Sequence, residues 1–98
     1  MWRHGDVFLA EVERIPSSAR ALPHCVLAEG ELTGHSHRIE ESGAALLYAD
    51  EDERFLEVTA EMATLVHQEH AAIPLPRGAY RVWVQREYSP QEIRRVVD

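Results

Sequence analysis

The strongest constraint on the fold is an alternation of apolar and polar residues near the end of the chain, in the segment 79–88. In an extended backbone, successive side chains point to opposite faces, so every second residue shares a face. One face carries Tyr80, Val82, Val84, Arg86 and Tyr88, and the other carries Arg81, Trp83, Gln85 and Glu87. The segment is therefore the clearest β-strand of the sequence.

Other short extended runs are separated by residues that favour turns. The predicted strands are 7–15, 25–28 with a continuation toward 35–37, 44–49 and 54–58. Turns are predicted at 16–18, at 42–43, at the acidic tip 50–53 and at 74–78, where two prolines and a glycine occur together. The prolines between 16 and 23 discourage a long helix in that connection.

The segment 59–72 fits two periodicities. Met62, Leu65, Val66 and Glu69 have the spacing of a helix face, whereas 63–67 fits a strand. Predicted strands flank this segment on both sides, so we favour the strand.

The residues after the last strand have the features of a helix start. Ser89 is a suitable N-cap, Pro90 suits the first helical position, and Glu92 completes a capping box. We therefore predict an all-β fold, a small single-domain β-barrel or sandwich over residues 1–98, with a short C-terminal helical turn.

The size and the charge of the chain limit its partners. A domain of 98 residues buries only a little over roughly 60% of its unfolded surface, so a metal or a homo-oligomer would add stability to a marginal core. The formal net charge of −7 argues against a general nucleic-acid binder, because affinity for the phosphate backbone rests on cations. The arginine-rich segment 77–98 still allows a local site for a small anion.

Two residue types further restrict the chemistry and the compartment. All ten basic residues are arginine, and the absence of lysine excludes Schiff-base chemistry and a P-loop. Cys25 is the single cysteine, so no internal disulfide can form, which suits a reducing compartment. No long apolar run follows Met1, and the sequence predicts neither a signal peptide nor a membrane span. We expect a cytoplasmic protein.

The first histidine pair is His35-Ser36-His37, late in a predicted strand. Period-2 geometry points both imidazoles from one face, and Glu41 has the same parity. Two imidazole nitrogens and one carboxylate form a ligand set that suits zinc, manganese, iron or nickel.

The second pair is His67 and His70, three residues apart. A regular strand would place them on opposite faces, so convergence needs a strand that ends near Gln68. We therefore place His67 at the strand end and His70 in the following turn, and we favour His67 as the ligand. His4 and His24 have no histidine close to them in the sequence, and we leave them out of the predicted site.

The segment Gly34-His35-Ser36-His37-Arg38-Ile39-Glu40-Glu41 resembles the first motif of the cupins, in which a glycine-led strand carries H-x-H and then a glutamate. The resemblance implies a small double-stranded β-barrel with a metal held by three histidines and one glutamate, and it implies His35, His37 and Glu41 as ligands. The second cupin motif is not matched, because no histidine follows Pro76-Arg77-Gly78. The whole pattern is also similar to small hypothetical proteins of phages and bacteria, whose function is unassigned.

The leading hypothesis is a divalent-metal protein, and it assigns a role to each candidate residue. His35, His37 and His67 would be ligands, with Glu41 or His70 completing the shell; Glu69 would be the general base, and Arg81 or Arg86 would hold an anionic group of a small substrate. With an open position, the metal would act as a Lewis acid or lower the pKa of a bound water to about 7. Four protein ligands would instead make the metal structural.

Two alternatives belong to other functional classes. One is metal-free acid–base cleavage of a phosphodiester, as in a ribonuclease, with one histidine from each pair and an arginine that stabilises developing charge. The other is a non-enzymatic interaction or oligomerisation module, with Trp2, Trp83 and Tyr88 forming the contact face.

Overall fold

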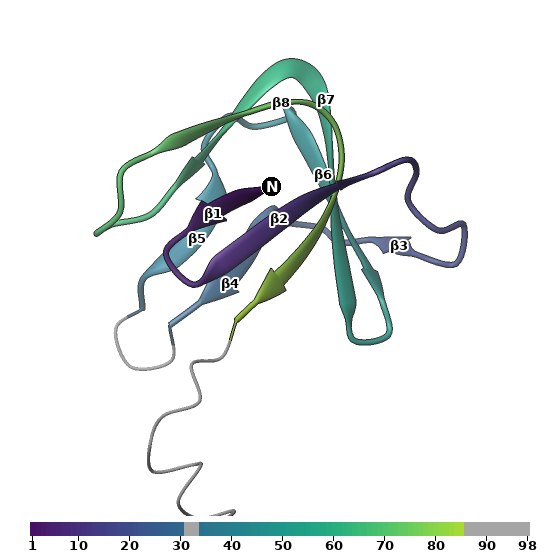
Figure 1. Ribbon diagram of the computed structural model, residues 1–98, viewed down its shortest axis with the longest axis horizontal. Helices are drawn as coiled ribbons and strands as arrows, with labels where there is room; N and C mark the ends of the chain where they lie inside the picture. Colours follow the sequence, from purple (N-terminus) through teal and green to yellow (C-terminus); the bar gives the residue numbers. More distant parts are fainter. Residues whose placement is uncertain (31–33, 86–98) are drawn as a thin grey trace, which may run out of the picture.

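The computed structural model describes residues 1–30 and 34–85. This part of the chain is all-β and forms one antiparallel sheet, shown in Figure 1. The strands are β1 (Trp2–His4), β2 (Val7–Val12), β3 (Arg20–Ala21), β4 (Val26–Glu29), β5 (Ser36–Ile39), β6 (Ala45–Asp50), β7 (Glu53–Val66) and β8 (Ile73–Val84). The predicted C-terminal helical turn lies outside the described residues.

The two longest strands give the sheet its shape. The main order is β1-β2-β8-β7-β5-β4, while β6 pairs with β7 and with β3. The register of β7 against β8 shifts between Val58 and Met62. On one side of this shift β7 pairs with β6, and beyond it β7 pairs with β5. The long strands curve across the molecule in Figure 1, so the sheet is sandwich-like and not a closed barrel.

The buried side chains of several strands form one core. Its fully buried side chains come from β2, β6, β7 and β8; they are Val7, Leu9, Leu47, Leu56, Val58, Leu65, Leu75 and Tyr80. Tyr80 donates its hydroxyl to the Pro76 carbonyl, and the Trp2 ring packs edge-on against it at 5.3 Å between centroids. Burial of Tyr80 and Val82 beside an exposed Arg81 follows the predicted alternation of the last strand, but Val84, predicted on the buried face, is 42% exposed where β8 ends.

Most of the predicted strands are found, with differences at their ends. Strands occur at 26–29, 45–50 and from 53 onward, and the segment 59–66 continues β7 as a strand and not as a helix. The first predicted strand was too long, because β2 ends at Val12. The short strands β1 and β3 were not predicted.

The predicted turn at 74–78 is wrong, because these residues lie inside β8. Pro74 and Pro76 pair with Thr64 and Met62 of β7. On the other side, β2 ends opposite Ala79, so within the described residues no strand covers this part of β8. Proline is tolerated on such an edge because its missing N–H breaks no ladder bond, and it discourages pairing with another chain.

The second tryptophan lies on the outer face of the sheet. Trp83 is half-buried and stacks on Phe8, with 5.8 Å between ring centroids. The Arg81 guanidinium lies 5.2 Å above the Trp83 ring. The contact face predicted for an interaction module also included Trp2 and Tyr88. Trp2 packs against the core, and Tyr88 lies outside the described residues. None of the described residues forms a helix that is long and apolar enough to cross a membrane.

Candidate metal centre

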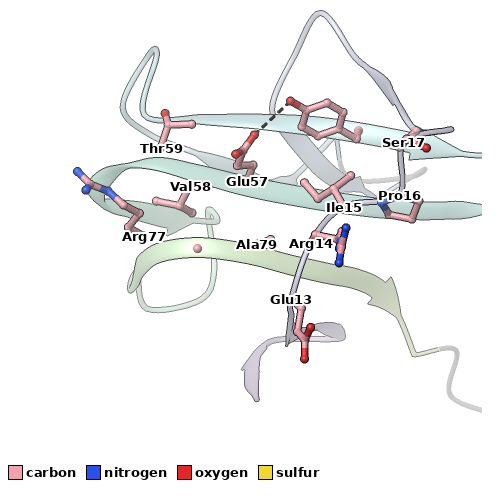
Figure 2. A pocket seen from close by; sticks show the side chains of 13 residues that line it. Glu13, Arg14, Ile15, Pro16, Ser17, Glu57, Val58, Thr59, Arg77 and Ala79 are labelled. Carbon is pink, nitrogen blue, oxygen red and sulfur yellow. Dashed lines mark hydrogen bonds between the residues drawn. The ribbon is translucent and has the colours of Figure 1, made fainter.

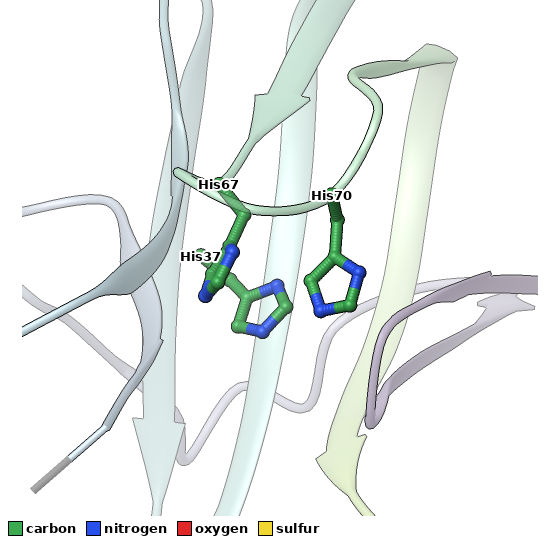
Figure 3. A group of neighbouring side chains, drawn as sticks. All are labelled: His37, His67 and His70. Carbon is green, nitrogen blue, oxygen red and sulfur yellow. The ribbon is translucent and has the colours of Figure 1, made fainter. Parts of the chain in front are cut away.

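Three imidazoles meet at one end of the sheet, as Figure 3 shows. His37 comes from β5, His67 follows the last residue of β7, and His70 lies in the connection to β8. One ring nitrogen from each residue lies within 4.8 Å of the others. The His37 and His67 rings are 4.2 Å apart between centroids, and the His67 and His70 rings are 4.7 Å apart.

Strand pairing and one local turn produce this convergence. Arg38 of β5 pairs with Val66, the last residue of β7, in an antiparallel register. His37, which precedes Arg38, and His67, which follows Val66, therefore lie side by side. The chain then turns, and the Glu69 amide donates a hydrogen bond to His67 Nδ1 at 3.0 Å. This turn returns His70 to the same side as His67. Both histidines of the second pair therefore face the cluster, whereas we had favoured His67 alone.

His4, which the sequence analysis left out, is buried directly behind His37. Its Nε2 lies 2.9 Å from the Ala71 carbonyl oxygen, and its Nδ1 lies 2.9 Å from His37 Nδ1. A carbonyl only accepts, so Nε2 of His4 carries a proton, and in neutral His4 Nδ1 is then an acceptor. His37 therefore donates from Nδ1, which leaves the lone pair of its Nε2 facing the cluster.

Burial and mutual proximity favour the neutral form of these histidines. Burial, followed by the nearby His67 and His4 imidazoles, lowers the pKa of His37 to about 4. Burial is also the largest cause that lowers the pKa of His4 and that of His67. Neutral imidazoles offer lone pairs to a metal without first losing a proton, so His37 and His67 are ready for ligation at neutral pH.

The turn between β1 and β2 lies against the cluster. Gly5 has φ of +65°, a conformation that favours glycine, and occupies the first position of a two-residue hairpin turn. A Cβ atom at Gly5 would lie 2.7 Å from His70 Nε2 and 3.0 Å from His37 Cε1. The next residue places Asp6 Oδ1 3.4 Å from His37 Nε2. The turn therefore covers the histidines at van der Waals distance.

Replacing Gly5 with alanine tests this close approach. Gly5→Ala should lower the free energy of unfolding by roughly 1–2 kcal/mol more than Gly43→Ala, because overpacking adds to the cost of positive φ. Gly43 is a matched control, since its φ is +82° and nothing lies within 4 Å of its added Cβ. Urea unfolding of the metal-free variants measures the difference, and equal losses would contradict the packing argument.

A cleft of about 740 Å³ opens beside the histidines. Its lining includes Arg3, Asp6, Glu29 and Glu69 together with the three imidazoles. Glu69 and His35 also line this cleft, and Glu69 Oε2 lies 2.9 Å from His35 Nδ1. His35 therefore faces Glu69, next to the three-histidine cluster and not within it.

The remaining predicted site residues lie elsewhere. β5 ends at Ile39, so the parity that was expected to align Glu41 with the histidines is lost. The Glu41 carboxylate instead accepts hydrogen bonds from the Thr64 amide at 2.7 Å and hydroxyl at 2.6 Å. Arg81 forms an ion pair with Glu53 at 3.2 Å on the outer face, away from the cleft. Arg86 lies outside the described residues.

The sequence contained a signal for the residues that were missed. Gly5-Asp6 between two extended runs is typical of a two-residue hairpin turn. That hairpin makes residues 2–4 a strand and places His4 and Asp6 at one end of it. Which other strands this end would meet depends on the curvature of the sheet, and no local pattern carries that information.

A second cleft, of about 870 Å³, has different chemistry. Figure 2 shows its walls, formed by residues 13–17, 57–59 and 77–79. No histidine or cysteine is among its lining residues, and its Glu57 carboxylate accepts a hydrogen bond from Tyr48 at 3.2 Å. His37, His67 and His70 line the smaller cleft instead.

Comparison with known proteins identifies the family. No curated protein and no solved structure matches the chain. The model of a family described as Domain of unknown function (DUF8820) matches residues 3–85. The match spans β2 to β8 and all residues of the histidine cluster, with His4 and Asp6 included. The chain therefore belongs to the DUF8820 family.

Proposed function

We propose that the protein binds one divalent transition-metal ion through His37, His67 and His70. The observation that carries this proposal is the meeting of three imidazole nitrogens within 4.8 Å of one another. Ligand atoms around tetrahedral zinc are about 3.4 Å apart, as follows from bonds of about 2.1 Å. Side-chain rotations that move the ring nitrogens by about 1 Å would therefore bring all three to ligand distance from one ion.

The support for His37 as a ligand comes from the residue behind it. A metal-ligating histidine commonly uses one ring nitrogen for the metal and donates the other N–H to a fixed acceptor. His4 supplies that acceptor, and His4 is itself fixed by the Ala71 carbonyl. His67 makes a smaller contribution to preorganisation. Ligation through either of its nitrogens displaces the Glu69 amide from Nδ1, at a cost of about 1 kcal/mol.

The proposed ion would face the cleft and act as a Lewis acid. A metal in this position polarises a substrate carbonyl or phosphoryl oxygen, or activates a bound water. Glu69 lines the same cleft, with its Oε2 2.9 Å from Nδ1 of His35, and we assign it the role of general base. Arg3 lines the cleft and takes the anion-binding role for which Arg81 and Arg86 were candidates. We propose a small anionic substrate on this basis.

Ring spacing makes metal-free phosphodiester cleavage the weaker proposal. That mechanism needs one histidine on each side of the reacting phosphate. The His37 and His67 rings are only 4.2 Å apart between centroids, so no phosphate group fits between them. The three-imidazole arrangement thus favours metal over metal-free chemistry.

The test is the metal content of protein purified without a metal-affinity tag and incubated with zinc, manganese, iron(II) or nickel salts. We expect one equivalent of one of these metals in the wild type and none in His67→Ala/His70→Ala. His24→Ala is the matched control, because His24 is exposed and bonds only the nearby Val26 amide in the described structure. A metal-free wild type, or a double variant that keeps its metal, would overturn the proposal.

A further inference from the structure

We infer that the carboxylate of Asp6 is a fourth ligand of the metal, supplied by the β1–β2 turn. This inference rests on the proposed three-histidine site, and it adds a ligand that neither the H-x-H pattern nor the meeting of the three imidazoles includes. Asp6 Oδ1 lies 3.4 Å from Nε2 of His37. The argument depends on which of these two atoms carries a proton.

The hydrogen bonds behind His37 decide the position of that proton. If Nε2 of His37 were protonated and donated to Asp6, neutral His37 would have to accept at Nδ1. His4 would then donate from Nδ1 while also donating from Nε2 to the Ala71 carbonyl, which requires a buried His4 imidazolium. His4 is only 2% exposed, and burying the charge of an imidazolium there is costly. In the neutral arrangement, a carboxylate oxygen and an imidazole lone pair face each other.

Two lone pairs at this distance repel unless a cation lies between them. The separation fits a metal ion, because two bonds of about 2.1 Å whose outer atoms are 3.4 Å apart meet at an angle of about 108°, close to the tetrahedral value. Asp6 also lines the cleft that His37, His67 and His70 line. The carboxylate therefore shares this cleft with the three histidines.

The backbone holds Asp6 in this position. The two-residue turn is fixed by pairing of His4 with Val7, and its first residue, Gly5, lies against His70 and His37. The Asp6 side chain itself is 62% exposed, so it approaches the cluster from the solvent side. A metal bound by all four residues would be covered by the turn on that side, so the substrate or water of the proposed Lewis-acid role would enter from the cleft as a fifth ligand.

A carboxylate ligand changes which metals the site prefers. Three neutral imidazoles suit most late first-row ions, including soft copper(I), whereas a hard anionic oxygen favours divalent ions such as zinc, manganese, iron(II), cobalt and nickel. The fourth ligand also cancels one of the two positive charges of the ion. We therefore assign the site to a hard or borderline divalent cation.

Cobalt(II) is the probe for the test, because its visible absorption depends on the type and geometry of its ligands. Asp6→Asn should weaken Co²⁺ binding at least tenfold and change the visible spectrum of the bound ion. Asp6→Ser removes the carboxylate in a second way and should behave similarly, whereas Asp6→Glu should recover part of the affinity. Asp52→Asn is the matched control, since it removes the same charge at the exposed β6–β7 tip.

The outcomes separate this inference from the proposed function. Wild-type affinity and an unchanged Co²⁺ spectrum in both Asp6→Asn and Asp6→Ser would overturn the role of Asp6 and leave the three-histidine site standing. Equal weakening in Asp6→Asn and Asp52→Asn would also overturn it, because a general charge effect would then explain the loss. A wild type that takes up no Co²⁺ would overturn both.

Discussion

Saturating zinc is expected to raise the free energy of unfolding by about 4 kcal/mol when free zinc exceeds Kd about a thousandfold. For a domain of this size, that corresponds to a rise in the unfolding midpoint of roughly 15–30 °C. The proposed ligands come from segments distant in the sequence, so the unfolded chain does not assemble them. Zinc therefore binds the native state in preference to the unfolded state. His37 and His70 are on β5 and in the β7–β8 connection, and Asp6 is in the first hairpin.

Thermal unfolding with and without zinc, followed by circular dichroism, measures this stabilisation. His37→Ala should show almost no response to zinc, and a chelator should reverse the response of the wild type. Cys25→Ser serves as the control, because the thiol donates to the Ala45 carbonyl and is not among the residues lining the histidine cleft. A full zinc response in His37→Ala would contradict the proposed ligand set.

The sequence predicted the histidine cluster better than it predicted the rest of the site. The H-x-H spacing and the strand end near His67 follow from local patterns, and His37, His67 and His70 do meet. Glu41 does not lie with these histidines, because its predicted position assumed that the strand stays regular beyond Ile39, where β5 ends. The metal itself, and the resemblance to cupins, stay predictions.

The partners that only tertiary structure reveals are His4 and Asp6. His4 is 33 residues from His37, and their hydrogen bond exists because the curved sheet brings β1 back to β5. A register shift such as that between β7 and β8 bends a strand, and it is not encoded in an alternation of residues. Arg81 shows the opposite case. The alternation of the last strand predicts that Arg81 points away from the core, and for that reason Arg81 does not line the histidine cleft.

The proline-rich segment of β8 shows how position within a sheet overrides a turn signal. Pro74, Pro76 and Gly78 together are typical of a turn. They nevertheless continue the strand, because only β7 pairs with this part of β8 among the described strands. A single sequence does not reveal which strand edges are unpaired, so the turn was the natural prediction and was wrong.

Acid should destabilise the metal-free protein well before its carboxylates titrate. His37 is 7% exposed, and its pKa falls from an ordinary value of 6.5 to about 4 in the folded protein. Between these values the unfolded chain binds a proton that the native state excludes. Stability is therefore fully present above pH 6.5 and decreases as the pH falls toward 4. The loss from His37 alone reaches about 3 kcal/mol, since each pKa unit corresponds to about 1.4 kcal/mol.

Urea unfolding at pH 7, 6, 5 and 4 in the presence of a chelator would measure this slope. His37→Gln should remove most of it, because glutamine keeps a polar side chain next to His4 but does not titrate. His24→Gln removes an exposed histidine and should keep the slope of the wild type. Burial also lowers the pKa of His4 and that of His67, so part of the slope should remain in His37→Gln. A stability that stays flat from pH 7 to pH 4.5 would show that the native state protonates His37 as readily as the unfolded chain does. The buried, neutral state of His37 on which the proposed ligation depends would then be wrong.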